Sequence, residues 1–116
     1  MSVTIYHNPR CSKSRQTLQL LVDQGIDAEI IEYLKTPPSA ADIKKILSML
    51  NMQARDLMRK KEPEFRENHL DDDQLSEADL VDAISKHPKL MERPIVVNNG
   101  KAAIGRPPEN VLGILS

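Results

Sequence analysis

Residues 3–12 read VTIYHNPRCS and connect an apolar run to a cysteine through a turn. The run at residues 3–6 is β-branched and aromatic, which predicts a strand, and the Asn-Pro pair after it favours a turn. From Ser12 onward apolar residues recur at helical spacing, and Gly25 suits the left-handed conformation that commonly ends a helix. The sequence therefore predicts a strand, a loop that carries Cys11, and a helix.

Strand patterns recur after this helix and again near the end of the chain. Residues 28–33 predict a second strand, which a right-handed crossover would place parallel to the first. Residues 95–97 and 101–104 predict two antiparallel strands, because Asn99-Gly100 between them suits a type I′ turn. Pro107 stands where a closing helix would begin.

The middle of the chain is predicted to be helical. Ser39-Ala-Ala-Asp42 and Ser76-Glu-Ala-Asp79 have the form of capping boxes, and each precedes apolar residues at helical spacing. A short helical piece is expected at about 55–60. Residues 62–73 hold many charges and a proline, which predicts an exposed and looser segment.

The order of these elements is βαβ, then helices, then ββα. That order predicts an α/β fold with a thioredoxin-like mixed sheet. A length of 116 residues is typical of one domain. We therefore expect a single domain over residues 1–116, with a helical insertion at about 39–90.

Composition excludes several classes of protein. A net charge of -1, with no Trp, two Tyr and one Phe, gives neither the charge nor the aromatic platform of a nucleic-acid binder. No apolar run approaches the length of a membrane span, and no signal-like segment opens the chain, so we expect a cytoplasmic protein. One cysteine excludes an internal disulfide and any metal site built on paired thiolates.

The surroundings of Cys11 are cationic, although the whole chain is nearly neutral. Helix starts favour anions because their backbone N–H groups are unpaired. Residues 86–106 hold five basic residues and one acidic residue. Residues 1–22 hold no acidic residue, and their basic residues are Arg10, Lys13 and Arg15. This pattern predicts a reactive Cys11 thiolate in an anion-binding site; the alternative, a buried small hydrophobe, is disfavoured by its polar neighbours.

A lowered thiol pKa would not by itself make the reaction of Cys11 as a nucleophile much faster. Nucleophilicity falls as the pKa of a thiol falls, with a Brønsted slope of about 0.4–0.5. Arginines around an oxyanion would add more, since one well-placed donor contributes about 2.7–4 kcal/mol. We therefore expect arginines near Cys11, with His7 either as a hydrogen-bond partner that orients the site or as a turn cap.

Spacing excludes two other kinds of site. The phosphatase loop C-x5-R needs an arginine at position 17, which is Thr17. The histidines at 7, 69 and 87 lack the i, i+4 spacing of helical zinc ligands. We expect no bound metal and no bound cofactor.

Several short segments spread over nearly the whole chain carry a resemblance. The sequence is similar to the ArsC family, the glutaredoxin-dependent arsenate reductases of thioredoxin-like fold. The matching segments are YHNPRCSKSR at 6–15, Tyr33-Leu34 with Pro37-Pro38, LMRK at 57–60, His87-Pro88, RPIVV at 93–97 and GRP at 105–107.

The resemblance implies roles for particular residues. Cys11 would be the nucleophile that takes arsenate, and His7 would assist its thiolate. Arg59, Arg93 and Arg106 would surround the oxyanion.

The resemblance also implies a cis peptide bond before Pro94, and Ser14, Arg15 and Pro94 are candidates for supporting roles. In the implied reaction glutathione is a co-substrate and glutaredoxin is the partner that supplies the reducing thiol. An external thiol suits a chain with one cysteine.

Two alternatives to arsenate reduction stay open. Position 10 is Arg, where better-known members have a small residue, so a related thiol oxidoreductase could act on another substrate such as glutathione mixed disulfides. The Spx-type regulators share the fold and bind RNA polymerase. They commonly carry a C-x-x-C switch, whereas Ser14 stands in the fourth position of this chain.

Overall fold

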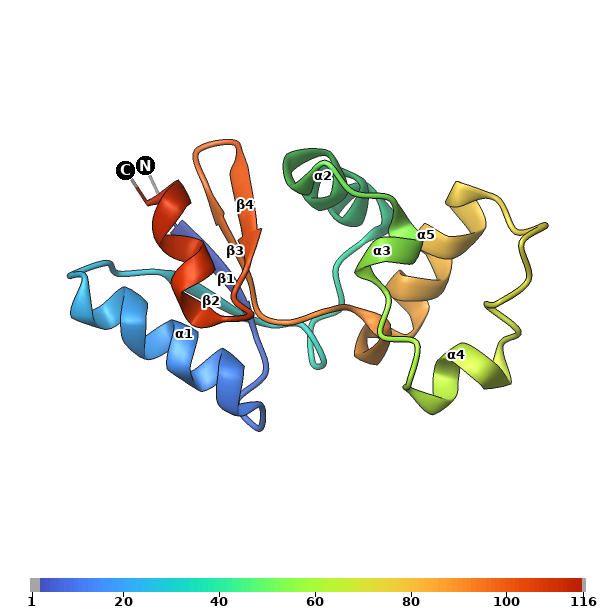
Figure 1. The fold of residues 1–116 in the computed structure, drawn as a ribbon, viewed down its shortest axis with the longest axis horizontal. Helices are drawn as coiled ribbons and strands as arrows, with labels where there is room; N and C mark the ends of the chain where they lie inside the picture. Colours follow the sequence, from blue (N-terminus) through green and yellow to red (C-terminus); the bar gives the residue numbers. More distant parts are fainter. Residues whose placement is uncertain (1–2, 116) are drawn as a thin grey trace. The chain divides into compact units, whose positions relative to one another are not determined.

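The N-terminal part of the chain has the predicted strand, helix and strand. The structure is a computed structural model and describes residues 3–115. Strand β1 (Val3–His7) leads into helix α1 (Ser12–Asp23), and strand β2 (Glu29–Glu32) returns parallel to β1 (Figure 1). Gly25 has a φ of 73° and directly follows the C-cap of α1, as its sequence position predicts.

Two further strands complete a four-stranded mixed sheet in the order β2-β1-β3-β4. Strand β3 (Ile95–Asn98) is antiparallel to β1, and strand β4 (Lys101–Ile104) is antiparallel to β3. Asn99 and Gly100 have φ values of 52° and 79°, the positive angles that a type I′ turn requires. The predicted thioredoxin-like mixed sheet is confirmed.

Helix α1 and the 3₁₀ helix η2 (Pro108–Ile114) contact the sheet and each other. The core of the sheet, α1 and η2 contains Ile5, Leu21, Val96 and Val111, all fully buried. The closing helix begins one residue later than predicted, because Pro107 caps it in an extended conformation and Pro108 takes the first helical position.

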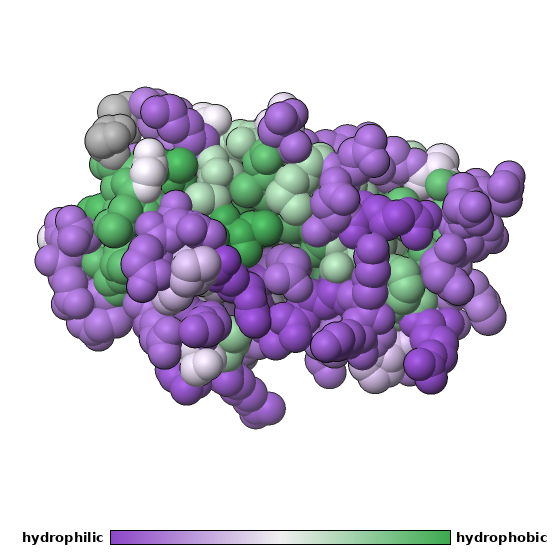
Figure 2. Space-filling view, viewed as in Figure 1, coloured by the Kyte–Doolittle hydropathy of each residue, from purple (hydrophilic) through white to green (hydrophobic). Residues whose placement is uncertain are grey.

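The chain divides into two compact units, and the sheet with α1 and η2 forms the first of them, made by residues 3–36 and 93–115. Hydrophobic residues reach the surface of this unit (Figure 2). The large ones with the greatest exposed fractions are Val22 and Ile30, at 56% and 50%.

The second unit, Pro37–Glu92, is helical. Its α-helices are α2 (Ala40–Leu50), α3 (Ala54–Leu57), α4 (Pro63–Glu67) and α5 (Glu77–Lys86), followed by the 3₁₀ helix η1 (Pro88–Leu90). Helices α2 and α5 contact each other, and each has buried apolar side chains, such as Ile46 in α2 and Ile84 in α5. In the part of the chain that the structure describes, no helix has the length and apolarity to cross a membrane.

Both predicted capping boxes are present in this unit. The hydroxyls of Ser39 and Ser76 each accept from the backbone N–H three residues later, at 3.1 Å, and α2 and α5 begin there. The prediction of a loose segment at 62–73 is wrong in part, because α4 forms within it. Pro63 occupies the first turn of α4, where its fixed φ favours a helix and its missing N–H costs nothing.

Candidate functional site

The side chain of Cys11 lies at the start of helix α1. Cys11 is the N-cap residue, with φ of -95° and ψ of 123°. Its backbone N–H donates to the carbonyl of Asn8 at 3.0 Å and closes the loop, and its own carbonyl accepts from the N–H of Arg15 at 3.0 Å. The residue is partly exposed.

The pKa of the Cys11 thiol lies below its ordinary value. Burial raises this pKa, but the Ser14 backbone N–H, the Arg93 guanidinium and the Lys13 backbone N–H lower it by more, since each stabilises the thiolate. The side chain makes no capping hydrogen bond in the structure. The amides of Ser14 and Lys13, in the first helical turn, are thus the backbone groups that favour the charged sulfur.

His7 contacts Ser14. Its Nδ1 lies 2.6 Å from the Ser14 Oγ, which also accepts the backbone N–H of Asn8 at 3.0 Å. Burial lowers the pKa of His7, the Glu32 carboxylate raises it, and the charge of Arg15 lowers it; the net direction is downward. The Nδ1 of a neutral imidazole can accept a hydrogen bond from the Ser14 hydroxyl. The contact joins the end of β1 to the first turn of α1, and a role of His7 at the Cys11 thiolate stays a prediction.

Arg93 is brought to Cys11 by the segment before β3. The Arg93-Pro94 peptide bond is cis, as the family resemblance implies. The Pro94 carbonyl accepts the N–H of Gly105 at 2.9 Å, and the Thr17 hydroxyl on α1 lies 3.4 Å from the Gly105 carbonyl. These contacts join the segments before β3 and after β4 to the helix that carries Cys11.

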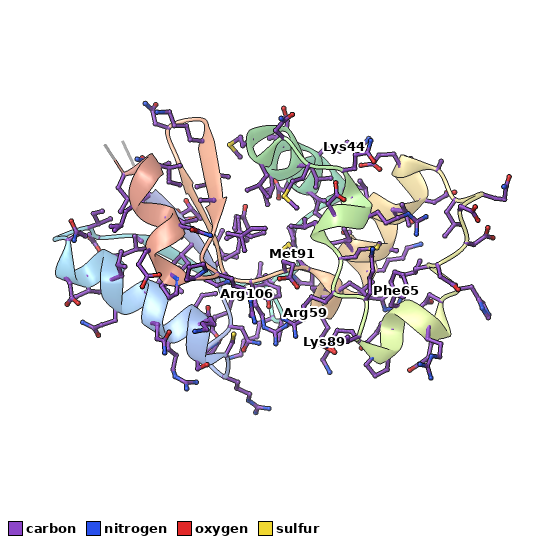
Figure 3. All side chains as sticks on the ribbon, viewed as in Figure 1. Lys44, Arg59, Phe65, Lys89, Met91 and Arg106 are labelled. Atoms are coloured by element: carbon purple, nitrogen blue, oxygen red, sulfur yellow. The ribbon has the colours of Figure 1, made fainter. Side chains whose placement is uncertain are left out.

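Arg15 and Arg106 belong to the same unit as Cys11. The Arg15 side chain donates to the carbonyl of Pro9 at 2.9 Å and so braces the loop before Cys11. Arg106 lies between β4 and η2 and is exposed (Figure 3), and its carbonyl accepts from the Asn110 side chain at 3.1 Å. A second cis bond joins Arg106 to Pro107.

Arg59 belongs to the Pro37–Glu92 unit and lies between α3 and α4 (Figure 3). Its backbone N–H donates to the Leu90 carbonyl at 2.6 Å. Its guanidinium pairs with the carboxylates of Glu62 at 3.7 Å and Glu92 at 3.9 Å. An oxyanion role for Arg59 stays a prediction from the family resemblance.

Tyr33 and Asn8 have no role in the site predicted from the sequence. His7 pairs with Glu32 in the parallel register, so Tyr33 follows β2 at the sheet edge where Asn8 follows β1. Tyr33 is fully buried, and Asn8 is 9% exposed. A sequence signal for both exists, since each is a polar residue directly after one of two parallel strands.

Tyr33 lies within electrostatic reach of the groups around the sulfur. Burial raises the pKa of the Tyr33 hydroxyl, the Arg93 guanidinium and the Asn8 side chain lower it, and a negative Cys11 raises it; the net direction is upward. Arg93 therefore acts on both Cys11 and Tyr33.

Two further features of the described residues bear on ligand chemistry, namely metal-ligating groups and pockets. Residues 3–115 contain no group of three or more His, Cys, Asp or Glu side chains placed to hold a metal ion. An open pocket of about 200 Å³ lies beside the Cys11 loop, lined by Asn8, Pro9, Arg10, Glu32, Leu34 and Lys35. A larger pocket of about 550 Å³ is lined by residues of the other unit, at 60–63 and 66–67.

Comparison with known proteins gives a consistent family. The model of the ArsC family matches residues 6–114. The chain is 50% identical to an arsenate reductase of Haemophilus influenzae, over 99% of this chain and 100% of that one. It is 57% identical to the uncharacterized protein YfgD of Escherichia coli, over 97% and 96% of the two chains.

A solved structure agrees with these relatives. The arsenate reductase from Vibrio cholerae superposes on this chain with a TM-score of 0.96 and is 54% identical in sequence. The match covers 99% of this chain and 98% of that one.

Proposed function

This chain belongs to the ArsC family, and on that premise we propose that it reduces arsenate through a Cys11 thiolate, with glutathione and glutaredoxin as the source of electrons. The proposal is supported by relatives named arsenate reductase that match the chain over nearly its whole length. At the level of atoms, its main support is that Arg93 and the first-turn amides of α1 favour the Cys11 thiolate.

The first proposed step is attack of the Cys11 thiolate on the arsenic atom of arsenate. A sulfur–arsenic bond forms, and one arsenate oxygen takes up protons and leaves as water. The same donors that favour the thiolate would favour the anionic oxygens, because a helix start and a guanidinium both stabilise negative charge. Partial exposure of Cys11 leaves a path for the substrate.

The later steps need thiols from outside the chain, which has one cysteine. We propose that the thiol of glutathione displaces a second oxygen as water and forms a second arsenic–sulfur bond. A glutaredoxin thiolate then attacks the glutathione sulfur. A disulfide forms, the bond between arsenic and glutathione breaks, and its electron pair stays on arsenic, which passes from As(V) to As(III). Hydrolysis of the remaining bond releases arsenite and restores the Cys11 thiol.

The remaining site residues take supporting roles in this proposal. Arg93 binds the oxyanion, and the family resemblance implies Arg106 as a further ligand; a part for Arg59 stays an expectation from that resemblance. His7 and Ser14 hold the first turn of α1 in place through their mutual hydrogen bond, which keeps the amides directed at the sulfur.

The proposal is tested by arsenate-dependent NADPH oxidation, coupled through glutathione, glutaredoxin and glutathione reductase. We expect turnover that needs every component and is abolished in Cys11→Ser. The matched control is Ser12→Ala, a change at the exposed residue next to Cys11, which should retain turnover.

Two results would replace the proposal. Reduction of a glutathione mixed disulfide without any reduction of arsenate would assign the chain to another thiol oxidoreduction. Absence of both activities, together with co-purification of RNA polymerase, would support a regulator.

A further inference from the structure

The Tyr33 hydroxyl is buried without a hydrogen-bond partner. Tyr33 has 0% exposure, and its Oη makes no hydrogen bond to any group in the part of the chain that the structure describes. Buried polar groups are nearly always paired, because an unpaired one loses its hydration and gains nothing in return. An unpaired buried hydroxyl at the edge of a reactive site therefore calls for an explanation.

The groups beside this hydroxyl are donors. Arg93 has five N–H donors and no acceptor. The Asn8 side-chain oxygen already accepts the backbone N–H of Arg10 at 3.0 Å, and its NH₂ group is a donor. Arg93 and Asn8 both lower the pKa of the Tyr33 hydroxyl, as donors do, because they favour a negatively charged oxygen. The groups named here are thus donors, and the hydroxyl proton has no acceptor among the described residues.

The acceptor that fits this position is an anion. Cys11 lies close enough to Tyr33 for a thiolate to disfavour a phenolate. The hydrogen bonds that favour the thiolate come from Ser14, Arg93 and Lys13. The sulfur therefore has its own donors, and a ligand oxygen bound beside it is the natural partner of the Tyr33 proton.

The backbone holds Tyr33 in a fixed position. It follows β2 directly, inside a tight turn in which the N–H groups of Lys35 and Thr36 both donate to the Glu32 carbonyl at 2.9 Å. The turn starts from a strand that is paired with β1 as far as His7. The backbone that carries this hydroxyl is thus in place before a ligand arrives, and such preorganisation is the property of an effective oxyanion donor.

We propose that Tyr33 belongs to the oxyanion site and that its hydroxyl donates a hydrogen bond to an oxygen of the tetrahedral anion bound beside Cys11. This inference rests on the proposed function, whose substrate is such an anion. The raised pKa of the hydroxyl is consistent with it, because a protonated tyrosine can donate. Tyr33 would then contribute to binding and turnover and leave the ionisation of Cys11 to Arg93 and the amides.

The test is protection of Cys11 from iodoacetamide by sulfate and by arsenate, in wild type, Tyr33→Phe and Tyr6→Phe. The phenylalanine keeps the ring and removes only the hydroxyl. We expect the anion concentration that gives half-protection to rise roughly ten- to hundred-fold in Tyr33→Phe, the range for a hydrogen bond to a charged group. Tyr6→Phe removes the other phenol hydroxyl of the chain. In this variant the anion concentration that gives half-protection of Cys11 should equal that of wild type.

Two further measurements separate this role from a structural one. The pH dependence of alkylation without anion should stay as in wild type, because the thiolate has other donors. The urea midpoint of Tyr33→Phe should be unchanged or higher, since an unpaired buried hydroxyl is lost. A hydroxyl that served the fold would give the opposite pattern, with a lower urea midpoint and intact protection.

The outcomes distinguish this inference from the proposed function. Protection of wild type with equal protection of Tyr33→Phe would overturn the role of Tyr33 and leave the oxyanion site standing. Equal weakening in Tyr33→Phe and Tyr6→Phe would also overturn it. Failure of both anions to protect wild type would remove the oxyanion site itself, and the role of Tyr33 with it.

Discussion

The Ser14 Oγ and the His7 Nδ1 lie 2.6 Å apart in the interior of the protein. Ser14 is fully buried and His7 is 6% exposed. Their contact joins the last residue of β1 to the first turn of α1, and the loop between them carries Cys11. The loop that carries the sulfur is thus held at both ends by a buried polar pair.

Ser14→Ala should lower the free energy of unfolding by about 1–3 kcal/mol, because it leaves His7 Nδ1 and the Asn8 N–H buried without their partner. The measurement is urea denaturation followed by circular dichroism. The pKa of Cys11 should change little, since Ser14 acts on the sulfur through its backbone N–H, which alanine retains. Ser12→Ala, at an exposed position of the same turn, is the matched control.

Arg93→Ala should move the pKa of Cys11 upward. The guanidinium favours the thiolate both by charge and by hydrogen bonding, so its removal stabilises the neutral thiol relative to the charged one. The rate of iodoacetamide alkylation, measured from pH 5 to 10, should then rise at a higher pH than in wild type. Arg10→Ala removes an exposed charge one residue from Cys11 and should shift the profile less. A larger shift in Arg10→Ala would contradict the assignment to Arg93.

His7 should make the protein less stable in mild acid. Its pKa is lowered by folding, so the unfolded chain binds a proton more readily than the native one. Stability is therefore full above the ordinary histidine pKa of about 6.5 and falls as the pH drops through that value toward the folded one. Urea midpoints between pH 5 and 8 measure this slope.

The control for His7 is a second histidine. His7→Asn should flatten the acid slope, because the titrating group is gone. His69→Asn should keep it, since His69 is exposed, and its φ of 53° suits asparagine. An unchanged slope in His7→Asn would show that another group causes the acid sensitivity.

Gly105→Ala should destabilise the protein by about 1–3 kcal/mol and disturb the site. A Cβ at this position would lie 2.5 Å from the Thr17 Oγ1 and 2.9 Å from the Pro94 Cγ. The added methyl group would thus push the segment of Arg93 away from α1, which should also raise the pKa of Cys11. Thermal unfolding and thiol alkylation measure the two effects. Gly113→Ala, where a Cβ meets nothing within 4 Å, should leave both unchanged.

Local signals in the sequence were enough to predict most of the elements. Ser39 and Ser76 begin helices because each hydroxyl satisfies an N–H only three residues away. Gly25 and the Asn99-Gly100 pair act through their own backbone angles. The prediction of a loose segment at 62–73 is wrong in part, because the charges and the proline that indicate a loop are equally compatible with the short helix α4.

The amino-acid order by itself determined that Cys11 follows a strand and starts a helix, since those preferences operate between near neighbours. Which groups meet the sulfur was decided only by tertiary structure. Arg93 is beside it because β3 pairs with β1, and Tyr33 faces the same place because β2 lies parallel to β1 in a particular register. The physical reason is that strand pairing joins residues that are distant along the chain, and no local preference specifies which partners will be opposite one another.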